Sequence, residues 1–200
     1  MIHEKNKNSL FEKFLISSVL IIFSMIFVGG LTRLTDSGLS ITEWELFKGL
    51  LPPLNEKDWV RYFNLYKNIP QYEIVNSSMG LSEFKIIFYW EWFHRVLGRL
   101  IGLFFLIPLL YFQFKKNIPN YFIKIGYLIL FLVILQGIVG WYMVKSGLVN
   151  NTTVSHYRLA LHLTIALLII STIFWLIINV KKKIYKNFFK FSRNNLFFLF

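Results

Sequence analysis

The sequence predicts an all-α membrane protein built around a bundle of four transmembrane helices. Apolar residues are grouped into four long runs, at residues 14–31, 96–114, 125–144 and 159–180, and the chain as a whole is 56% hydrophobic and only 16% charged. Within these runs the only basic side chains are Arg99 and His162, and there is no acidic one. About 20 apolar residues, rising about 1.5 Å each, span the hydrocarbon core of a bilayer. Four helices apolar on all sides would leave a water-soluble domain without enough polar surface.

The segments between the runs predict how the helices are connected. The first run follows a basic N-terminus but lacks a clean small-residue cleavage site, so we expect it to be retained as a membrane helix rather than removed as a signal peptide. The connection at residues 34–88 is long enough to suggest a function of its own. In it, Asn55 before acidic residues predicts a helix start, Pro70 a helix end, and Ser82 the start of a helix that continues into the second run. The remaining connections are short and predict antiparallel hairpins.

The net charge of +12 is distributed in a way that predicts membrane orientation rather than nucleic-acid binding. Twelve of the 22 basic residues lie near residues 5–13, 115–124 and 181–193, which would share one side of the membrane, whereas eight of the ten acidic residues lie between residues 36 and 91. Basic residues that flank membrane helices favour the cytoplasmic side. We therefore expect the N-terminus inside, the long loop at residues 34–88 outside, contact with lipid, and no nucleic-acid partner.

The chain contains no cysteine. This excludes disulfides, iron–sulfur clusters, thiolate haem ligation, covalent c-type haem attachment and cysteine nucleophiles. Chemistry at a metal or cofactor would therefore depend on histidine and carboxylate side chains.

Two histidines are the strongest candidates for a functional site. His94 precedes the second apolar run by two residues, and His162 lies three residues after the start of the fourth. The second and fourth helices should cross the membrane in the same direction, so a rise of about 1.5 Å per residue places the two imidazoles within about one helical turn of the same depth. Ionisable side chains at such a position are costly and usually functional. Neutral imidazole is a common haem ligand, so the pair predicts a haem clamped between two helices.

Charged residues accompany His94 on the same helix. Glu91 is three residues before it and shares its face, while Arg95 follows at once and Arg99 lies one turn further. A carboxylate, an imidazole and guanidinium groups at the mouth of a bundle could carry a proton, bind iron and hold an anionic substituent. Two alternatives remain open from the residues alone: histidines that only hydrogen-bond a neighbouring helix, and a haem-binding or electron-transfer protein without catalytic activity.

Several short blocks, in order along nearly the whole chain, resemble the haem A synthase family, and most closely its alphaproteobacterial and mitochondrial branch. The blocks are GGLTRLTDSGLS at 29–40, EW at 43–44, LPPL at 51–54, EWFHRVLGR at 91–99, QG at 136–137, GWYMV at 140–144 and VSHYRLALHL at 154–163.

This resemblance implies a membrane oxidoreductase that oxidises the C8 methyl of haem O, by successive hydroxylations, to the formyl of haem A for cytochrome oxidase. It implies that His94 and His162 are the axial ligands of the substrate haem and that Glu91 is the essential carboxylate. We further expect Arg95, Arg99 and Arg158 to contact the haem propionates.

The family has eight membrane helices in two four-helix halves, and the second half is expected to hold a haem b. Residues 1–187 correspond to the N-terminal half, and residues 188–200 look like the start of a fifth membrane helix that is cut short. We expect a fragment, or a half that pairs with a second copy or a second-half chain. The resemblance also implies the bacterial or mitochondrial inner membrane, and haem O synthase as a partner.

Overall fold

The computed structural model describes residues 2–44, 48–116, 118–149 and 152–182. Within these residues all regular structure is helical. The elements in chain order are α1 (Ile2–Leu34), a 3₁₀ turn (Lys48–Leu50), α2 (Glu56–Tyr66), α3 (Pro70–Ile74), α4 (Leu81–Lys115), α5 (Asn120–Gly147) and α6 (His156–Lys182). The predicted fifth helix at residues 188–200 lies outside the described residues.

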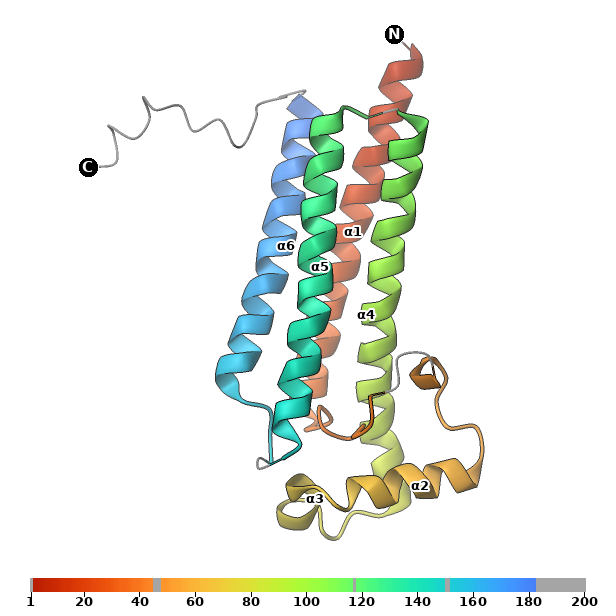
Figure 1. Cartoon of the computed structure of the whole chain (residues 1–200), viewed down its shortest axis with the longest axis vertical. Helices are drawn as coiled ribbons and strands as arrows, with labels where there is room; N and C mark the ends of the chain where they lie inside the picture. The colour runs from red at the N-terminus through yellow and green to blue at the C-terminus, as the bar shows by residue number, and fades with distance from the viewer. Residues whose placement is uncertain (1, 45–47, 117, 150–151, 183–200) are drawn as a thin grey trace, which may run out of the picture.

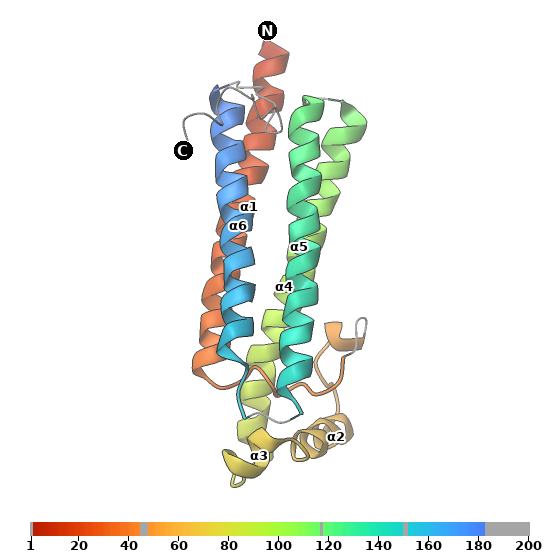
Figure 2. The same ribbon diagram turned by 60° about the vertical axis from the view of Figure 1, so that its left-hand side comes forward.

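The four long helices form an antiparallel bundle (Figure 1). Helix α1 packs against α4 and α6, and α5 packs against the same two helices, so α4 and α6 face each other diagonally across the bundle. Both α4 and α6 run away from the end where α2 and α3 lie (Figures 1 and 2). All four are long and apolar enough to cross a membrane, which confirms the predicted fold class.

The outward faces of the bundle are apolar. In the most apolar part of each long helix, between 22% and 44% of the residues are buried inside the protein, so most of these residues face outward. Phe23 and Phe131 are examples, with 67% and 59% of their surface exposed. Such faces suit hydrocarbon rather than water, and the chain is a multi-pass membrane protein.

Residues 48–80, which we call the outer cap, cover the end of the bundle opposite the N-terminus (Figure 1). Helix α2 begins at the predicted cap, because the side chain of Asn55 accepts a hydrogen bond from the backbone N–H of Asp58 at 2.8 Å. Its buried face carries Trp59 and Phe63, whose rings contact Phe88 and Phe84 on α4. The cap is therefore held to the first turns of α4 by aromatic packing.

Two predicted boundaries of the outer cap differ from the structure. Helix α2 ends at Tyr66, before Pro70, and the proline instead begins the short helix α3. This is a common use of proline, because the first turn of a helix needs no N–H from it. Helix α4 begins at Leu81 with Gly80 as N-cap, where the Glu83 carboxylate accepts a hydrogen bond from the Gly80 N–H at 2.9 Å. As predicted, it continues without a break into the second membrane span.

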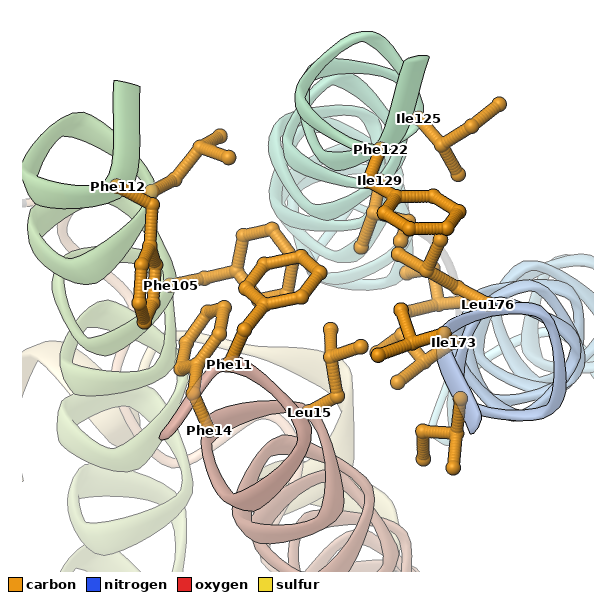
Figure 3. Close-up of a cluster of buried hydrophobic side chains, with 14 of the residues drawn as sticks. Phe11, Phe14, Leu15, Phe105, Phe112, Phe122, Ile125, Ile129, Ile173 and Leu176 are labelled. Atoms are coloured by element: carbon orange, nitrogen blue, oxygen red, sulfur yellow. The ribbon is translucent and has the colours of Figure 1, made fainter. Parts of the chain in front are cut away.

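The buried apolar side chains form two separate clusters. The inner cluster fills the bundle near the N-terminal end of α1, with phenylalanines and isoleucines from all four long helices meeting between them (Figure 3). The outer cluster lies at the opposite end and joins the outer cap to α4. Its fully or nearly fully buried members are Leu39, Ile41, Trp59, Phe63, Tyr66, Ile69, Phe84, Ile87, Phe88 and Val154.

Candidate functional site

Between the two clusters, each long helix has a stretch that contributes to neither of them. We call this level the central band, and it comprises residues 26–34 of α1, 93–100 of α4, 140–142 of α5 and 156–164 of α6. Protein interiors are normally packed without interruption. The central band is therefore the level of the described bundle at which the two apolar clusters are interrupted.

His94 lies in the central band with its ring against helix α1. A Cβ atom placed on Gly29 would be 3.0 Å from Cε1 and 3.6 Å from Nδ1 of His94. The Nδ1 atom is buried and has no hydrogen-bond partner among the described residues. The ring is thus supported by the backbone of α1 on its Nδ1–Cε1 edge, which leaves Nε2 as the nitrogen that can reach a ligand.

His162 repeats this arrangement on the other side of the bundle. A Cβ atom placed on Gly140 of α5 would be 3.0 Å from Cε1 and 3.6 Å from Nδ1 of His162. Its Nδ1 is likewise buried and unpartnered within the described part of the chain. Each histidine ring therefore packs against a glycine of the preceding membrane helix. His94 of α4 contacts Gly29 of α1, and His162 of α6 contacts Gly140 of α5.

The structure brings the two imidazoles together at one level. Both lie in the central band, on helices that face each other diagonally across the bundle. Each ring is only partly buried. Two imidazoles whose Nδ1 atoms have no partner among the described residues, at a level that belongs to neither apolar cluster, are side chains that could hold a haem iron.

Glu91 is buried, with only 2% of its surface exposed, and both carboxylate oxygens are engaged. One oxygen accepts hydrogen bonds from the Ser40 hydroxyl at 2.7 Å and from the Ile41 N–H at 2.8 Å. The other accepts from Arg95 at 2.6 and 3.1 Å. Arg95 also donates to the Ile41 carbonyl at 2.9 Å. Glu91 and Arg95 together hold residues 40–41 against α4 by hydrogen bonds. This role adds to the proton or charge chemistry expected from the sequence.

Arg95 and Arg99 line a narrow pocket between α4 and the outer loop. Arg99 donates to the Gly49 carbonyl at 3.0 Å, and the guanidinium of Arg95 lies over the ring of Trp44. The buried Nε1 of Trp92 faces no hydrogen-bond acceptor in the described residues. The complete lining is Ile41, Glu43, Gly49, Leu51, Tyr62, Phe88, Trp92, Arg95 and Arg99.

Arg158 lies apart from this pocket. It donates a hydrogen bond to the Ser146 hydroxyl and its guanidinium lies 5.1 Å from the centre of the Tyr142 ring, both on α5. His156, at the start of α6, is exposed. His94, Glu91, Arg95 and Arg99 therefore all lie on α4, diagonally across the bundle from His162 on α6. Arg158 is also on α6, but its contacts are with α5.

Sequence reasoning missed Gly29, Ser40 and Trp92. Gly140 appeared only as the first residue of the GWYMV block, with no role of its own. One signal was available for Gly29, because the Gly29–Gly30 pair lies at the end of an otherwise bulky apolar run. For Ser40 the sequence carries no signal, because its partner Glu91 is 51 residues away.

Comparison with known proteins gives a consistent result. A family described as cytochrome oxidase assembly protein matches residues 12–198. Three relatives named "Heme A synthase" come from Pelagibacter ubique, Parvibaculum lavamentivorans and Nitrosospira multiformis, and they are 53%, 49% and 52% identical to this chain. The matches cover 93%, 80% and 80% of this chain but 54%, 47% and 45% of the relatives. The chain therefore spans about half the length of these relatives. No solved structure matches it.

Proposed function

Because the chain belongs to the cytochrome oxidase assembly protein family, we propose that it carries the haem O site of a haem A synthase. The reaction is the oxidation of the C8 methyl of haem O, by successive hydroxylations, to the formyl of haem A. A haem b is expected in the part of the relatives that this chain does not cover. When bound, the haem iron supplies the redox chemistry, and the protein supplies ligands, orientation and charge.

One observation carries the proposal: His94 and His162 oppose each other in the central band, the only level of the described bundle without a packed apolar cluster. In this proposal, His94 and His162 would each hold the iron of haem O through one imidazole nitrogen. A single planar ligand held from both faces would fill the band and give the two imidazoles the partner they lack within the described residues.

The basic residues support binding of the haem propionates. Arg95 and Arg99, which follow His94 on α4, line one pocket, and Trp92, whose buried N–H has no acceptor among the described residues, lines it too. Arginine suits carboxylate recognition because its donors are fixed in a planar fork. Arg158 does not line this pocket and contacts Ser146 and Tyr142 on α5, so we assign it the weakest role of the three arginines.

Glu91 supports the site through its charge and its contacts. It holds Arg95 in place and ties residues 40–41 over the outer mouth of the central band. A buried negative charge three residues from His94 also favours positive charge that develops on a haem held there. We propose that Glu91 is required for conversion of haem O rather than for its binding.

Titration of the purified chain with ferric haem O, followed by visible absorption, tests the ligand assignment. The wild-type chain is expected to give the low-spin spectrum of bis-histidine haem. His94→Ala and His162→Ala are each expected to lose it, whereas His156→Ala, which alters an exposed histidine, should keep it. If all three variants keep the low-spin spectrum, the assignment of His94 and His162 as ligands is refuted.

A second function, haem binding or electron transfer without conversion, is favoured by the fully engaged carboxylate of Glu91. Haem O and a reducing system supplied to membranes that contain the chain distinguish the two. Hydroxylated or formyl haem in the extract supports the synthase, and Glu91→Ala should abolish it while haem binding persists. Unchanged haem O would favour the second function, or a requirement for the half that the chain does not cover.

The distribution of charge supports an inner-membrane location with the N-terminus inside and the outer cap outside. In this arrangement the central band lies near the outer surface. The expected partners are the lipid bilayer, the haem O synthase that supplies the substrate, and a second copy or second-half chain.

A further inference from the structure

We propose that Gly29 and Gly140 are positioning residues that fix the planes of the two imidazoles, so that both Nε2 atoms can bind one iron. The inference rests on the proposed haem site and goes beyond it, because it assigns the orientation of the ligands to two residues that touch no iron. The two glycines belong to different helix pairs, α1 with α4 and α5 with α6.

Among the described residues, no hydrogen-bond partner orients either histidine through Nδ1. A histidine that binds metal through one nitrogen generally donates the other N–H to a carboxylate, a carbonyl or water, which fixes the ring. In the part of the chain that the structure describes, Nδ1 of His94 and Nδ1 of His162 are buried without such a partner. Packing must therefore set the orientation of each ring.

The packing surface on each Nδ1–Cε1 edge is a glycine. An added Cβ would lie 3.0 Å from Cε1 and 3.6 Å from Nδ1 at both positions, although the two contacts form between different helices. At Gly140 the added Cβ would also lie 3.7 Å from Nε2 of His162, so this glycine faces the Cε1 corner of the ring. Contact between carbon atoms is optimal at about 3.5–4.0 Å, so a methyl group there would push the imidazole away from the neighbouring helix. The repetition of the same contact around both ligands argues for a common role.

The consequence of a methyl group follows from the geometry of the pair. A haem held between His94 and His162 would need one nitrogen of each ring to reach its iron, so the position of each imidazole would matter for binding. A displacement of a few tenths of an ångström at the Cε1 edge would strain one axial bond. The remaining protein need not change, because the helices keep their other contacts.

Two neighbouring glycines provide matched controls. Gly30 follows Gly29 on α1, and Gly137 lies one turn before Gly140 on α5, and a Cβ on either would meet nothing within 4 Å. Alanine is a better helix former than glycine, so none of the four substitutions should unwind its helix. Gly29→Ala and Gly140→Ala thus differ from Gly30→Ala and Gly137→Ala in the contact with histidine.

The experiment measures ferric haem O binding and the low-spin EPR signal of the loaded full chain. We expect Gly29→Ala and Gly140→Ala to bind at least about tenfold more weakly, the effect typical of lost support behind a ligating histidine, and to shift the low-spin signal. Gly30→Ala and Gly137→Ala should match the wild type. Wild-type affinity and signal in all four variants would overturn this inference while leaving the proposed haem site intact.

A second background separates orientation from general damage to the bundle. In His94→Gly supplied with free imidazole, the axial ligand no longer depends on Gly29, so adding Gly29→Ala should weaken haem binding by less than twofold. An equal loss in both backgrounds would mean that the methyl group disturbs the bundle itself, and would overturn the inference. Failure of the wild-type chain to bind haem would instead reject the proposed function, and this inference with it.

Discussion

At the scale of single residues, Glu91 and Arg95 form a buried ion pair on which the outer loop depends. Glu91→Ala would leave the guanidinium of Arg95, whose side chain is 13% exposed, without its carboxylate. Removing one partner of a buried pair typically costs about 3–5 kcal/mol, because the remaining charge is uncompensated. We expect a loss of this size in the free energy of unfolding, measured by denaturant titration in detergent.

The exposed pair between Glu43 and Arg61 is the control for this prediction. Its side chains are 36% and 50% exposed, so water screens their charges. Glu43→Ala should therefore cost less than about 1 kcal/mol. Equal losses for Glu91→Ala and Glu43→Ala would contradict the assignment of Glu91 as the anchor of residues 40–41.

Residues of the site differ in how far the sequence could predict them. His94, His162 and Arg99 stand out because a charged or ionisable side chain interrupts or borders an apolar run. Ser40 and Gly29 are ordinary residues until the fold places them beside Glu91 and His94. Their roles depend on contacts between distant segments, and the Gly29–Gly30 pair at the end of an apolar run does not by itself indicate a contact with His94.

At the scale of elements, a buried phenol links the outer cap to the bundle. Tyr66 at the end of α2 donates to the Gln71 side chain and accepts from Asn76, and Gln71 donates to the Asp36 carbonyl just beyond α1. Burial raises the pKa of the Tyr66 phenol above its ordinary value of 10.0.

This pKa shift predicts that the outer cap loosens at alkaline pH. Because the folded state holds the phenol proton more tightly than the unfolded state, the stabilisation is fully present below about pH 10 and is lost as the pH rises through the raised pKa. Hydrogen exchange of residues 56–74 between pH 8 and 11 measures the effect. Tyr66→Phe should be less protected at pH 8 and less sensitive to pH, and an unchanged pH dependence in this variant would refute the role of Tyr66.

The inner cluster should provide most of the stability of the bundle itself. Phe11 is 1% exposed and contacts the rings of Phe14, Phe112 and Phe122 (Figure 3), whereas Phe23 on the same helix is 67% exposed. Phe11→Ala should lower the free energy of unfolding by about 3–5 kcal/mol, because it leaves a cavity. Phe23→Ala should cost far less, and similar values in denaturant titrations of the two variants would be contrary to this packing.

Element boundaries were predictable where local chemistry determines them. Asn55 begins α2 as expected, because its side chain satisfies a free backbone N–H of the first turn. Pro70 was misinterpreted, because proline at the first position of a helix and proline after the end of one leave similar sequence patterns. In the folded chain, α2 ends at the buried Tyr66 and a short turn follows, so Pro70 is at the start of α3 rather than at the end of α2.

At the scale of the whole molecule, four spans and antiparallel hairpins were predictable, because run length and loop length determine them. The diagonal placement of α4 and α6 was not, because similar apolar helices can be ordered around a bundle in more than one way. That placement is what lets the histidines of two parallel helices oppose each other.

The absence of cysteine allows the membrane orientation to be tested directly. Lys116, after α4, and Asn64, on α2, are both exposed and lie at opposite ends of the bundle (Figure 1). In intact cells a membrane-impermeant maleimide should label Asn64→Cys and not Lys116→Cys. The reverse pattern would contradict the orientation inferred from the basic residues.

The central claim is that His94 and His162 of one chain bind the two faces of one haem. The most direct test is pulsed EPR of ferric haem bound to chain labelled with ¹⁵N-histidine. We expect low-spin iron, one haem per chain and couplings to two histidine nitrogens, with one coupling lost in His94→Ala and the other in His162→Ala. Coupling to a single histidine, or two couplings that survive both substitutions, would contradict it.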